Sequence, residues 1–211
     1  MNHCEHCGKI IPTNEGRGRA RRYCDATCRQ RARREGLKTP PWQMLMETRW
    51  VRWKPIERSG KITKMPIQPD GLPASSTDPA TWTDYEIAES SHAGVGMGFV
   101  LGDGFACLDL DHCYDARNHL AEWARQFVAI AGDTFIEISP SGDGLHIWGL
   151  CEPRKGLKVR EGGMNIEAYS QGRYITVTGR PYKTSTRRLA DITMLMDFAE
   201  FLAQRSSRTL L

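Results

Sequence analysis

Phe105-Ala-Cys-Leu-Asp-Leu-Asp-His112 is an apolar run that ends in two carboxylates one residue apart. Alternate side chains of a β-strand point to the same face of the sheet, so we expect Asp109 and Asp111 to lie side by side. Two like charges at that separation repel each other, and a bound cation or a proton on one carboxylate would relieve the repulsion. The pair therefore favours a site for a hard divalent cation, Mg²⁺ or Mn²⁺. A strand that runs into a polar turn is the alternative, because Asp-x-Asp is a short and common pattern, which glycosyltransferases also use for their metal.

The whole chain has the composition of a globular protein. Its 211 residues are 40% hydrophobic and 26% charged, which suits one well-buried domain with a small appendage. No stretch approaches the roughly 20 apolar residues of a membrane span, and the N-terminus lacks the apolar run of a signal peptide. We therefore expect a cytoplasmic protein without membrane contact. Seven Cys without a secretory signal indicate thiols and metal ligands rather than disulfides.

Positive charge is concentrated in the first 38 residues. This segment has ten Lys and Arg against four Asp and Glu, a net +6, so the rest of the chain carries −2 of the total +4. A short helix is predicted after Cys28, and most of its surface is basic. Such a helix has little to bury and can contact phosphates, so it predicts nucleic-acid binding; a merely solvated helix is the alternative. The basic side chains in question are Arg29, Arg31, Arg33 and Arg34.

The same segment contains two short cysteine pairs. They are separated by sixteen residues and read Cys4-x-x-Cys7 and Cys24-x-x-x-Cys28. Zinc takes four soft ligands in a tetrahedron, and two such pairs supply them. We therefore predict a structural Zn²⁺ site in a module of residues 1–38, which is too small to fold without its metal. His3 or His6 could replace one thiolate, and reduced cysteines in a disordered basic arm are the other alternative.

Beyond a linker at 39–48, the apolar spacing predicts strands and helices that interleave without a regular βαβ period. Amphipathic helices are expected at 115–131 and 189–203, with a shorter one after Asp78-Pro79. This mixture indicates an α+β fold rather than a doubly wound sheet. We assign residues 49–204 to the main domain and 205–211 to a tail. Strands are expected at 49–54, 61–66, 105–111, 134–139, 145–150, 165–169 and 173–178.

Three stretches of the main domain hold side chains suited to metal and phosphate chemistry. The first is the acidic strand described above. The second is Ser139-Pro-Ser-Gly-Asp-Gly-Leu-His146, a flexible turn rich in backbone amides that precedes a histidine on a strand. The third carries Glu167 on a strand, followed by Gly172-Arg-Tyr-Ile-Thr-Val-Thr-Gly179. In this segment the guanidinium of Arg173 is suited to bind a triphosphate through paired N–H groups. Taken singly, each residue is more often a core histidine, a surface glutamate or an ordinary ion-pair partner.

Together, the order of these stretches resembles the archaeo-eukaryotic primase superfamily, and within it the bifunctional primase-polymerase (prim-pol) domains of phages and plasmids. The resemblance covers roughly residues 45–200. The cysteine segment is loosely similar to zinc-binding modules that accompany primases. The resemblance also includes three upstream segments: Trp53-Lys54, Gly60-Lys-Ile-Thr-Lys-Met-Pro66 and Asp78-Pro-Ala-Thr-Trp82.

The resemblance implies an RRM-like catalytic core that binds two metal ions, Mg²⁺ or Mn²⁺, and a nucleoside triphosphate. The implied reaction is template-directed nucleotidyl transfer on single-stranded DNA in phage or plasmid replication, which needs alignment and charge neutralisation but no protein nucleophile. A separate replicative helicase is a further expected partner. The metal ligands would be Asp109, Asp111 and Glu167. The nucleotide would be held by Ser141, Gly142 and His146 and, as weaker assignments, by Arg173 and Lys64.

Two other functions are compatible with the same residues. A non-catalytic nucleic-acid-binding protein could carry the zinc module on a degenerate primase fold and serve replication or its regulation. A metal-dependent nuclease or another phosphotransferase could use the same carboxylates. The intact set argues against decay, because carboxylates that repel each other have no structural use once activity is lost.

Overall fold

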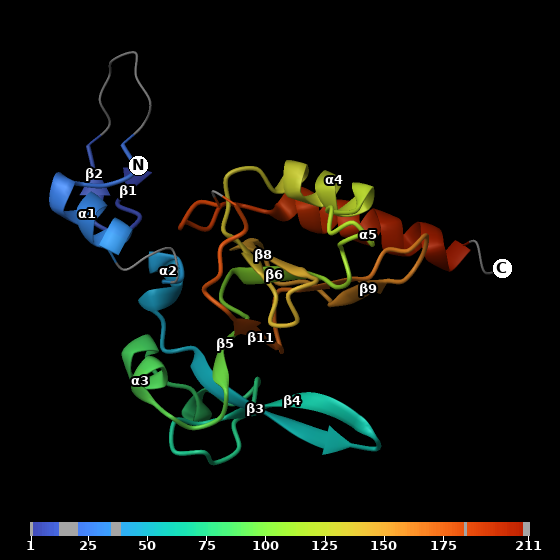
Figure 1. Ribbon diagram of the computed structural model, residues 1–211, viewed down its shortest axis with the longest axis horizontal. Coiled ribbons are helices and arrows are strands. Elements are labelled where there is room, and N and C mark those ends of the chain that lie inside the picture. Colours follow the sequence, from blue (N-terminus) through green and yellow to red (C-terminus); the bar gives the residue numbers. More distant parts are fainter. Residues whose placement is uncertain (1, 13–20, 35–38, 184, 209–211) are drawn as a thin grey trace.

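The computed structural model describes residues 2–12, 21–34, 39–183 and 185–208, which form a small cysteine module and a larger core (Figure 1). A short helix, α2 (Trp42–Leu45), lies in the predicted linker between them. The expected α+β fold is confirmed, because the core combines helices with two antiparallel sheets. The module consists of β1 (Asn2–His3), β2 (Ile10–Ile11) and α1 (Ala26–Arg34).

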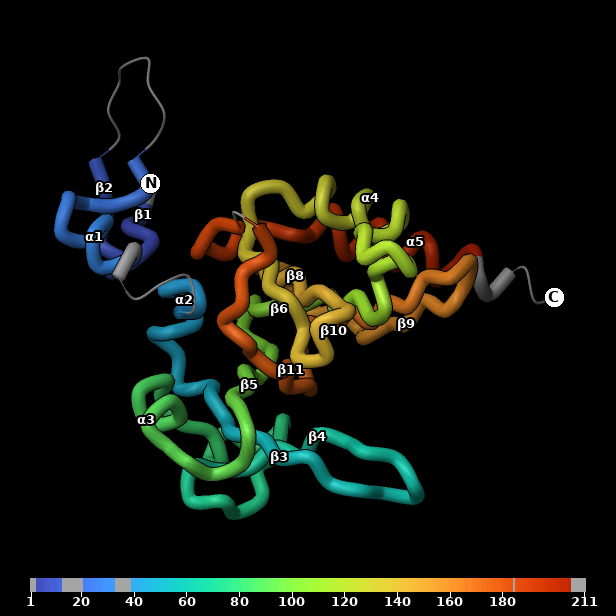
Figure 2. The backbone as a smooth tube through the Cα atoms, in the orientation of Figure 1, coloured from blue at the N-terminus to red at the C-terminus, as the bar shows by residue number. Residues whose placement is uncertain are grey.

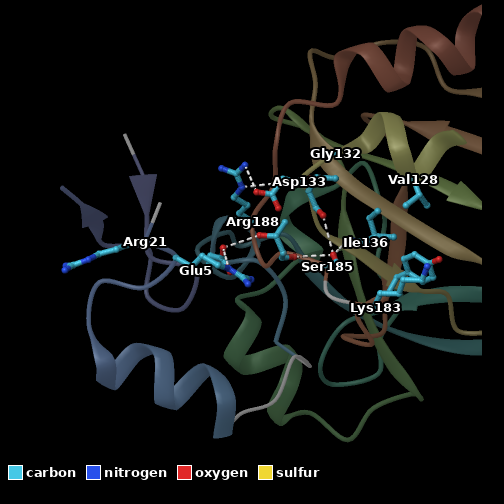
Figure 3. Close-up of a pocket in the computed structure, with 13 residues that line it drawn as sticks. Glu5, Arg21, Val128, Gly132, Asp133, Ile136, Lys183, Ser185 and Arg188 are labelled. Atoms are coloured by element: carbon cyan, nitrogen blue, oxygen red, sulfur yellow. Dashed lines mark hydrogen bonds and ion pairs between the residues drawn. The ribbon is translucent and has the colours of Figure 1, made fainter. Parts of the chain in front are cut away.

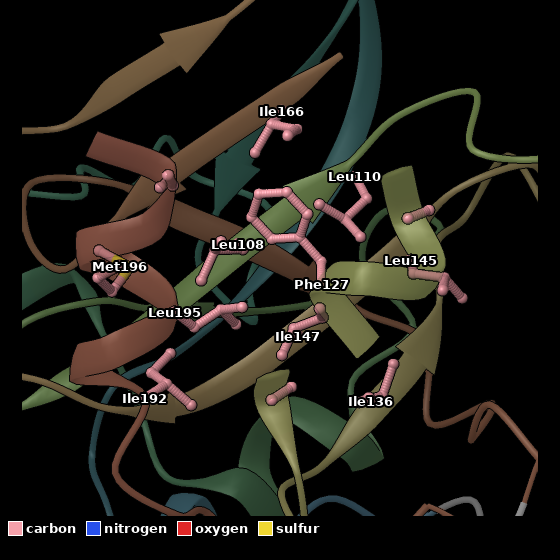
Figure 4. Close-up of a cluster of buried hydrophobic side chains, with 14 of the residues drawn as sticks. Leu108, Leu110, Phe127, Ile136, Leu145, Ile147, Ile166, Ile192, Leu195 and Met196 are labelled. Atoms are coloured by element: carbon pink, nitrogen blue, oxygen red, sulfur yellow. The ribbon is translucent and has the colours of Figure 1, made fainter. Parts of the chain in front are cut away.

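The larger sheet of the core has five antiparallel strands in the order β7-β8-β6-β10-β9. Two helices, α4 (Glu122–Ala131) and α5 (Thr193–Arg208), cover one face of it (Figure 1). Between these helices and the sheet lies a cluster of buried apolar side chains, with Leu108 and Ile147 from the sheet and Phe127 from α4 (Figure 4). The strands are β6 (Phe105–Leu110), β7 (Ile136–Ile138), β8 (Leu145–Leu150), β9 (Leu157–Val159) and β10 (Ile166–Tyr169).

The smaller sheet has the order β11-β5-β3-β4 and lies on the other side of the larger one. A second apolar cluster joins the two sheets, with Trp50 and Phe99 from the smaller sheet and Cys107, Trp148 and Tyr169 from the larger. Beside it lie α3 (Tyr85–Ser90) and a 3₁₀ turn (Pro79–Thr81), which begins at the predicted cap, Asp78. The strands are β3 (Trp50–Arg58), β4 (Lys61–Ile67), β5 (Gly96–Val100) and β11 (Tyr174–Val177).

The start of the helix predicted at 115–131 was wrong. The Asp115 carboxylate accepts the backbone N–H groups of Arg117 (2.9 Å) and His119 (2.8 Å), and Asn118 adopts a φ of +60°. These features close a turn, so α4 begins only at Glu122.

The helix predicted at 189–203 also starts late. Residues 189–192 are extended, and the N–H of Ile192 donates to Leu150 O (2.9 Å). The helix α5 begins at Thr193, whose N–H donates to Asp191 (2.7 Å), and continues to Arg208, so residues 205–208 of the predicted tail are helical. Residues 209–211 lie outside the described residues. None of the described helices is both long enough and apolar enough to span a lipid bilayer.

Candidate active site

One row of side chains crosses all five strands of the larger sheet. The register places Glu137 opposite His146 and His146 opposite Asp109. It then places Asp109 opposite Glu167 and Glu167 opposite Lys158. Directly opposite residues on neighbouring strands point to the same face. These five side chains therefore form one polar row, and the fold brings Asp109, His146 and Glu167 together in it.

The polar row lies on the face of the sheet that α4 and α5 leave uncovered. Leu108 and Leu110 point to the helices, so Asp109 points the other way, toward the smaller sheet. A cavity of about 200 Å³ lies there, and two carboxylates and two cations contribute to its wall. Such a mixture of charges suits a cation together with a phosphate. The lining residues are Lys64, Asp109, Glu167, Tyr169, Arg173, Tyr174, Ile175 and Thr176.

Asp109 has a carboxylate oxygen without a donor. Its Oδ1 is buried, has no hydrogen-bond partner among the described residues and lies 3.6 Å from His146 Nε2. Burial raises the pKa of Asp109; the positive charges of His146 and Lys64 oppose this shift. The negative charges of Asp111 and Glu167 raise the pKa further. A buried oxygen without a donor is costly, and a cation would satisfy it, so the residues present fit a divalent ion.

Glu137 lies on the other side of His146 and is saturated with donors. It is 0% exposed, and its Oε1 accepts hydrogen bonds from His146 Nδ1 (3.0 Å) and Trp148 Nε1 (3.1 Å). Its Oε2 accepts from the Thr178 amide (3.0 Å), the Thr178 hydroxyl (3.0 Å) and the Gly179 amide (2.9 Å). These contacts fix the orientation of the imidazole, so that Nε2 points toward Asp109.

Glu137 was not among the predicted site residues. Its one signal was a lone acid in the apolar run Phe135-Ile-Glu-Ile138, which resembles an ordinary buried strand. Its importance depends on the register with β8, which sets it opposite His146. Burial disfavours the charged form of His146, but the hydrogen bond to Glu137 and the charge of Asp109 outweigh it, so the pKa of His146 is raised.

Glu167 has oxygens that are already engaged. Its Oε1 accepts from Lys158 (2.7 Å) and Arg160 (2.6 Å), and its Oε2 accepts from the Tyr169 hydroxyl (2.7 Å). Partial burial disfavours the charged carboxylate, but the hydrogen bonds from Lys158 and Tyr169 outweigh it and lower the pKa of Glu167. Arg173 packs over the Tyr169 ring (4.8 Å) and donates to its hydroxyl (3.2 Å), so this cation belongs to the same network.

The other predicted residues lie at the edge of this site. The predicted strand 105–111 is one residue too long, because β6 ends at Leu110 and Asp111 follows it in a turn. Ser141 and Gly142 are exposed in the turn before β8 and are not among the residues that line the cavity. The Ser141 hydroxyl donates to Asp143 in the same turn. The nucleotide and metal roles of these residues stay predictions.

The four cysteines of the module converge on one point, with all Sγ atoms within 4.8 Å of one another. Hydrogen bonds from backbone amides outweigh the effect of burial and lower the pKa of Cys4 to about 7. His3 packs against Trp42 (5.1 Å between ring centroids). Among the described residues, these cysteines form the cluster that could hold a metal ion, whereas the carboxylates of the polar row do not converge in this way. The Sγ separations are 3.7 Å for Cys7–Cys24, 3.5 Å for Cys24–Cys28 and 3.7 Å for Cys7–Cys28.

The module contacts the core through Glu5 (Figure 3). Glu5 accepts two hydrogen bonds from Arg22 (2.8 and 2.7 Å) and one from the Thr186 hydroxyl of the core (3.3 Å). A cavity of about 610 Å³ lies at this contact, and none of its described lining residues belongs to the polar row. Of the predicted nucleic-acid-binding side chains, Arg29 and Arg31 are exposed on α1, whereas those of Arg33 and Arg34 lie outside the described residues.

Comparison with known proteins supports the motif analysis. No protein-family model matches the chain. Over 163 residues the chain is 39% identical to a DNA primase-polymerase of Nitratiruptor phage NrS-1. The match covers 72% of this chain and 22% of the relative, so the chain spans about a fifth of that protein's length. The resemblance of this chain to phage DNA primase-polymerases is thereby confirmed.

Proposed function

We propose that the chain catalyses template-directed nucleotidyl transfer in phage or plasmid replication, as a DNA primase, a DNA polymerase or both. The name of the relative, DNA primase-polymerase, supports this reaction class. The observation that carries the proposal is the polar row, in which the buried Oδ1 of Asp109 accepts no hydrogen bond from the described residues. Two cations, Lys64 and Arg173, line the same cavity. Carboxylates for a metal and cations for a triphosphate are the components that this reaction needs.

The proposal includes an RRM-like core. The strands β6 and β7 are both antiparallel to β8, and α4 crosses from one to the other. Together with β10 this gives the order β7-β8-β6-β10, which is the split βαβ arrangement of ferredoxin-like folds and supports the RRM-like assignment. The second covering helix, α5, follows β11 instead of connecting β8 to β10.

In this proposal Asp109, Asp111 and Glu167 hold Mg²⁺ or Mn²⁺. When bound, these ions would lower the pKa of the attacking hydroxyl and neutralise the leaving pyrophosphate. Lys64 and Arg173, which line the same cavity, bind phosphate oxygens. Arg173 is suited to this because its guanidinium is already held in place over Tyr169.

The resemblance also assigns Ser141, Gly142 and His146 to the incoming triphosphate. Ser141 and Gly142 are exposed and offer a hydroxyl and a backbone amide. His146 is 1% exposed and lies behind Asp109, so its first role is to orient that carboxylate, and contact with a phosphate requires a local rearrangement.

The remaining elements complete the proposal. Zn²⁺ occupies the four-cysteine cluster, and Arg29 and Arg31 on α1 contact single-stranded DNA. The template is made single-stranded by a replicative helicase in the host cytoplasm.

The test is incorporation of labelled nucleotides on single-stranded DNA with Mg²⁺ or Mn²⁺, with and without an annealed primer. The Asp109→Ala/Asp111→Ala variant is the control. Products made without a primer by the unchanged protein alone would establish a primase, and products made only with a primer would establish a polymerase. Loss of labelled DNA without added nucleotides would indicate a nuclease instead.

A non-catalytic DNA-binding protein on the same fold is the second candidate. The observation in its favour is Glu167, whose oxygens are engaged by Lys158, Arg160 and Tyr169 as in a structural ion-pair network. It predicts no product in either reaction, with DNA still bound.

A further inference from the structure

The hairpin of β3 and β4 extends beyond its sheet. Strand β3 pairs with β5 only from Trp50 to Trp53, whereas its pairing with β4 continues to Arg58 opposite Lys61. Residues 54–65 are therefore a two-stranded ribbon without a third strand, and it projects from the core (Figures 1 and 2). Two-stranded ribbons are marginally stable in water. Its base is held beside the cavity, because the Tyr174 hydroxyl donates to Lys64 O (2.8 Å).

The ribbon is strongly basic, and among the described residues its cations form no ion pair, although the Lys64 ammonium lies over the Trp53 ring (5.7 Å). It carries four cations and a single acid, Glu57. Within the described part of the chain, none of the four cations lies in an ion pair. Some other cations of the core are paired, as Arg125 is with Glu122 and Arg188 with Asp133. Unpaired like charges on one narrow element indicate a polyanionic ligand. The four cations are Lys54, Arg58, Lys61 and Lys64.

One face of the ribbon continues the wall of the cavity. Lys64, which lines the cavity, shares a face of β4 with Ile62, and Pro55 lies opposite Lys64 on β3. Ile62 is 78% exposed, and Pro55 is exposed as well. An exposed isoleucine on an edge strand is a liability unless a ligand covers it. Apolar side chains can contact bases only where the bases are unpaired.

We propose that the ribbon of residues 54–65 binds the single-stranded template next to the polar row. The strand crosses the edge of the ribbon: Ile62 and Pro55 contact its bases from the face that carries Lys64. Lys54, Arg58 and Lys61, which the register places on the other face, contact its phosphates. The inference rests on the proposed function for the identity of the strand, but it concerns binding and not chemistry.

The test measures the affinity of the full chain for a labelled oligo(dT) strand at several salt concentrations, without nucleotides or divalent metal. Arg58→Ala/Lys61→Ala should lower the affinity on the order of tenfold at 0.1 M salt and flatten the log–log salt dependence by about 1.4, since each phosphate contact on a single strand contributes about 0.7. Ile62→Ser should weaken binding roughly fivefold without changing the salt dependence, because it removes only apolar contact. Glu57→Lys should strengthen binding, a gain that misfolding cannot imitate.

The matched control is Arg117→Ala/Arg125→Ala, which removes two exposed cations, one on α4 and one in the turn before it. It should leave the salt dependence within experimental error. An unchanged salt dependence in Arg58→Ala/Lys61→Ala would overturn the inference, as would equal losses for single-stranded and duplex DNA. Ribbon-dependent binding in a protein that incorporates no nucleotide would refute the proposed function and leave this inference standing.

Discussion

Two carboxylates flank His146 in the polar row, and their surroundings are opposite. Glu137 accepts five hydrogen bonds and is fully buried. Asp109 has a buried Oδ1 that accepts no hydrogen bond from the described residues and lies 3.6 Å from His146 Nε2. Folding alone accounts for Glu137, since a buried charge is tolerated when its lone pairs are filled. It accounts less well for Asp109, because an oxygen without a hydrogen-bond donor is a cost that a ligand would reduce. The difference separates a carboxylate that the fold holds from the carboxylate that we propose to bind a metal ion.

The largest expected effect is on activity at Asp109. Asp109→Asn keeps the shape of the side chain but removes the charge that a metal needs, so nucleotide incorporation should fall at least about 10³-fold, or about 4 kcal/mol in the activation barrier. The free energy of unfolding should stay equal or rise by up to about 1 kcal/mol, because burial already disfavours the charged form, as its raised pKa indicates. Incorporation assays and urea unfolding measure the two quantities. Full activity, or a large loss of stability, would remove the distinction between the two carboxylates.

For Glu137 we expect the main effect on the free energy of unfolding. Glu137→Ala leaves the imidazole, indole and backbone donors that face this carboxylate without an acceptor, whereas the Thr178 hydroxyl keeps Ile138 O, so the free energy of unfolding should fall by about 3–5 kcal/mol. The control is Glu152→Ala. Because Glu152 is exposed, this variant should change the free energy of unfolding by less than about 0.5 kcal/mol. Urea unfolding of both variants provides the measurement. A loss below about 1 kcal/mol for Glu137→Ala would mean that the hydrogen bonds do not stabilise the fold as their geometry indicates.

The sequence allowed the α+β class and three of the five residues of the row to be predicted, but not Glu137 or Lys158. Asp109, His146 and Glu167 were singled out because they lie in three stretches whose order resembles that of prim-pol domains. Glu137 also lies in an apolar strand, but it belonged to none of these stretches. Its role depends on which strands are neighbours, and strand order is a non-local property that apolar spacing does not reveal.

Local hydrogen bonding explains the errors in the helix starts. The apolar spacing before α4 continues to Asp115, but that side chain binds the N–H groups of Arg117 and His119 and makes a turn instead. The hydrogen bonds to Glu167 could not be predicted either, because Lys158 and Arg160 come from β9 and the segment that follows it. The contacts of Asp115 are local, whereas those of Glu167 are tertiary contacts that the apolar pattern does not contain.

Removing metal from the cysteine module should have a smaller effect on the core. Among the described residues, the buried apolar cluster of the module consists of Cys4, Ile11 and Cys28 with Tyr23 and Cys24 packed against it, so a chelator should unfold the module. The core has its own apolar clusters, and the hydrogen bond from Thr186 to Glu5 is a weak link to the module, so the free energy of unfolding of the core should change by about 1 kcal/mol or less. Amide resonances of residues 2–34 and of the core, recorded with and without chelator, separate the two. Cooperative loss of both sets would show that the core depends on the module.

The smallest effect is expected at the outer end of the row. Lys158 is 52% exposed and shares Glu167 with Arg160, so Lys158→Ala leaves the carboxylate paired and should lower the free energy of unfolding by less than about 1 kcal/mol. Nucleotide incorporation should stay within about threefold of the unchanged protein if the ion pair is only structural. An increase of more than about threefold at low Mg²⁺ would mean that Lys158 competes with the metal ion for Glu167. The variant therefore decides whether Glu167 is a structural carboxylate, like Glu137, or can bind a ligand, as we propose for Asp109.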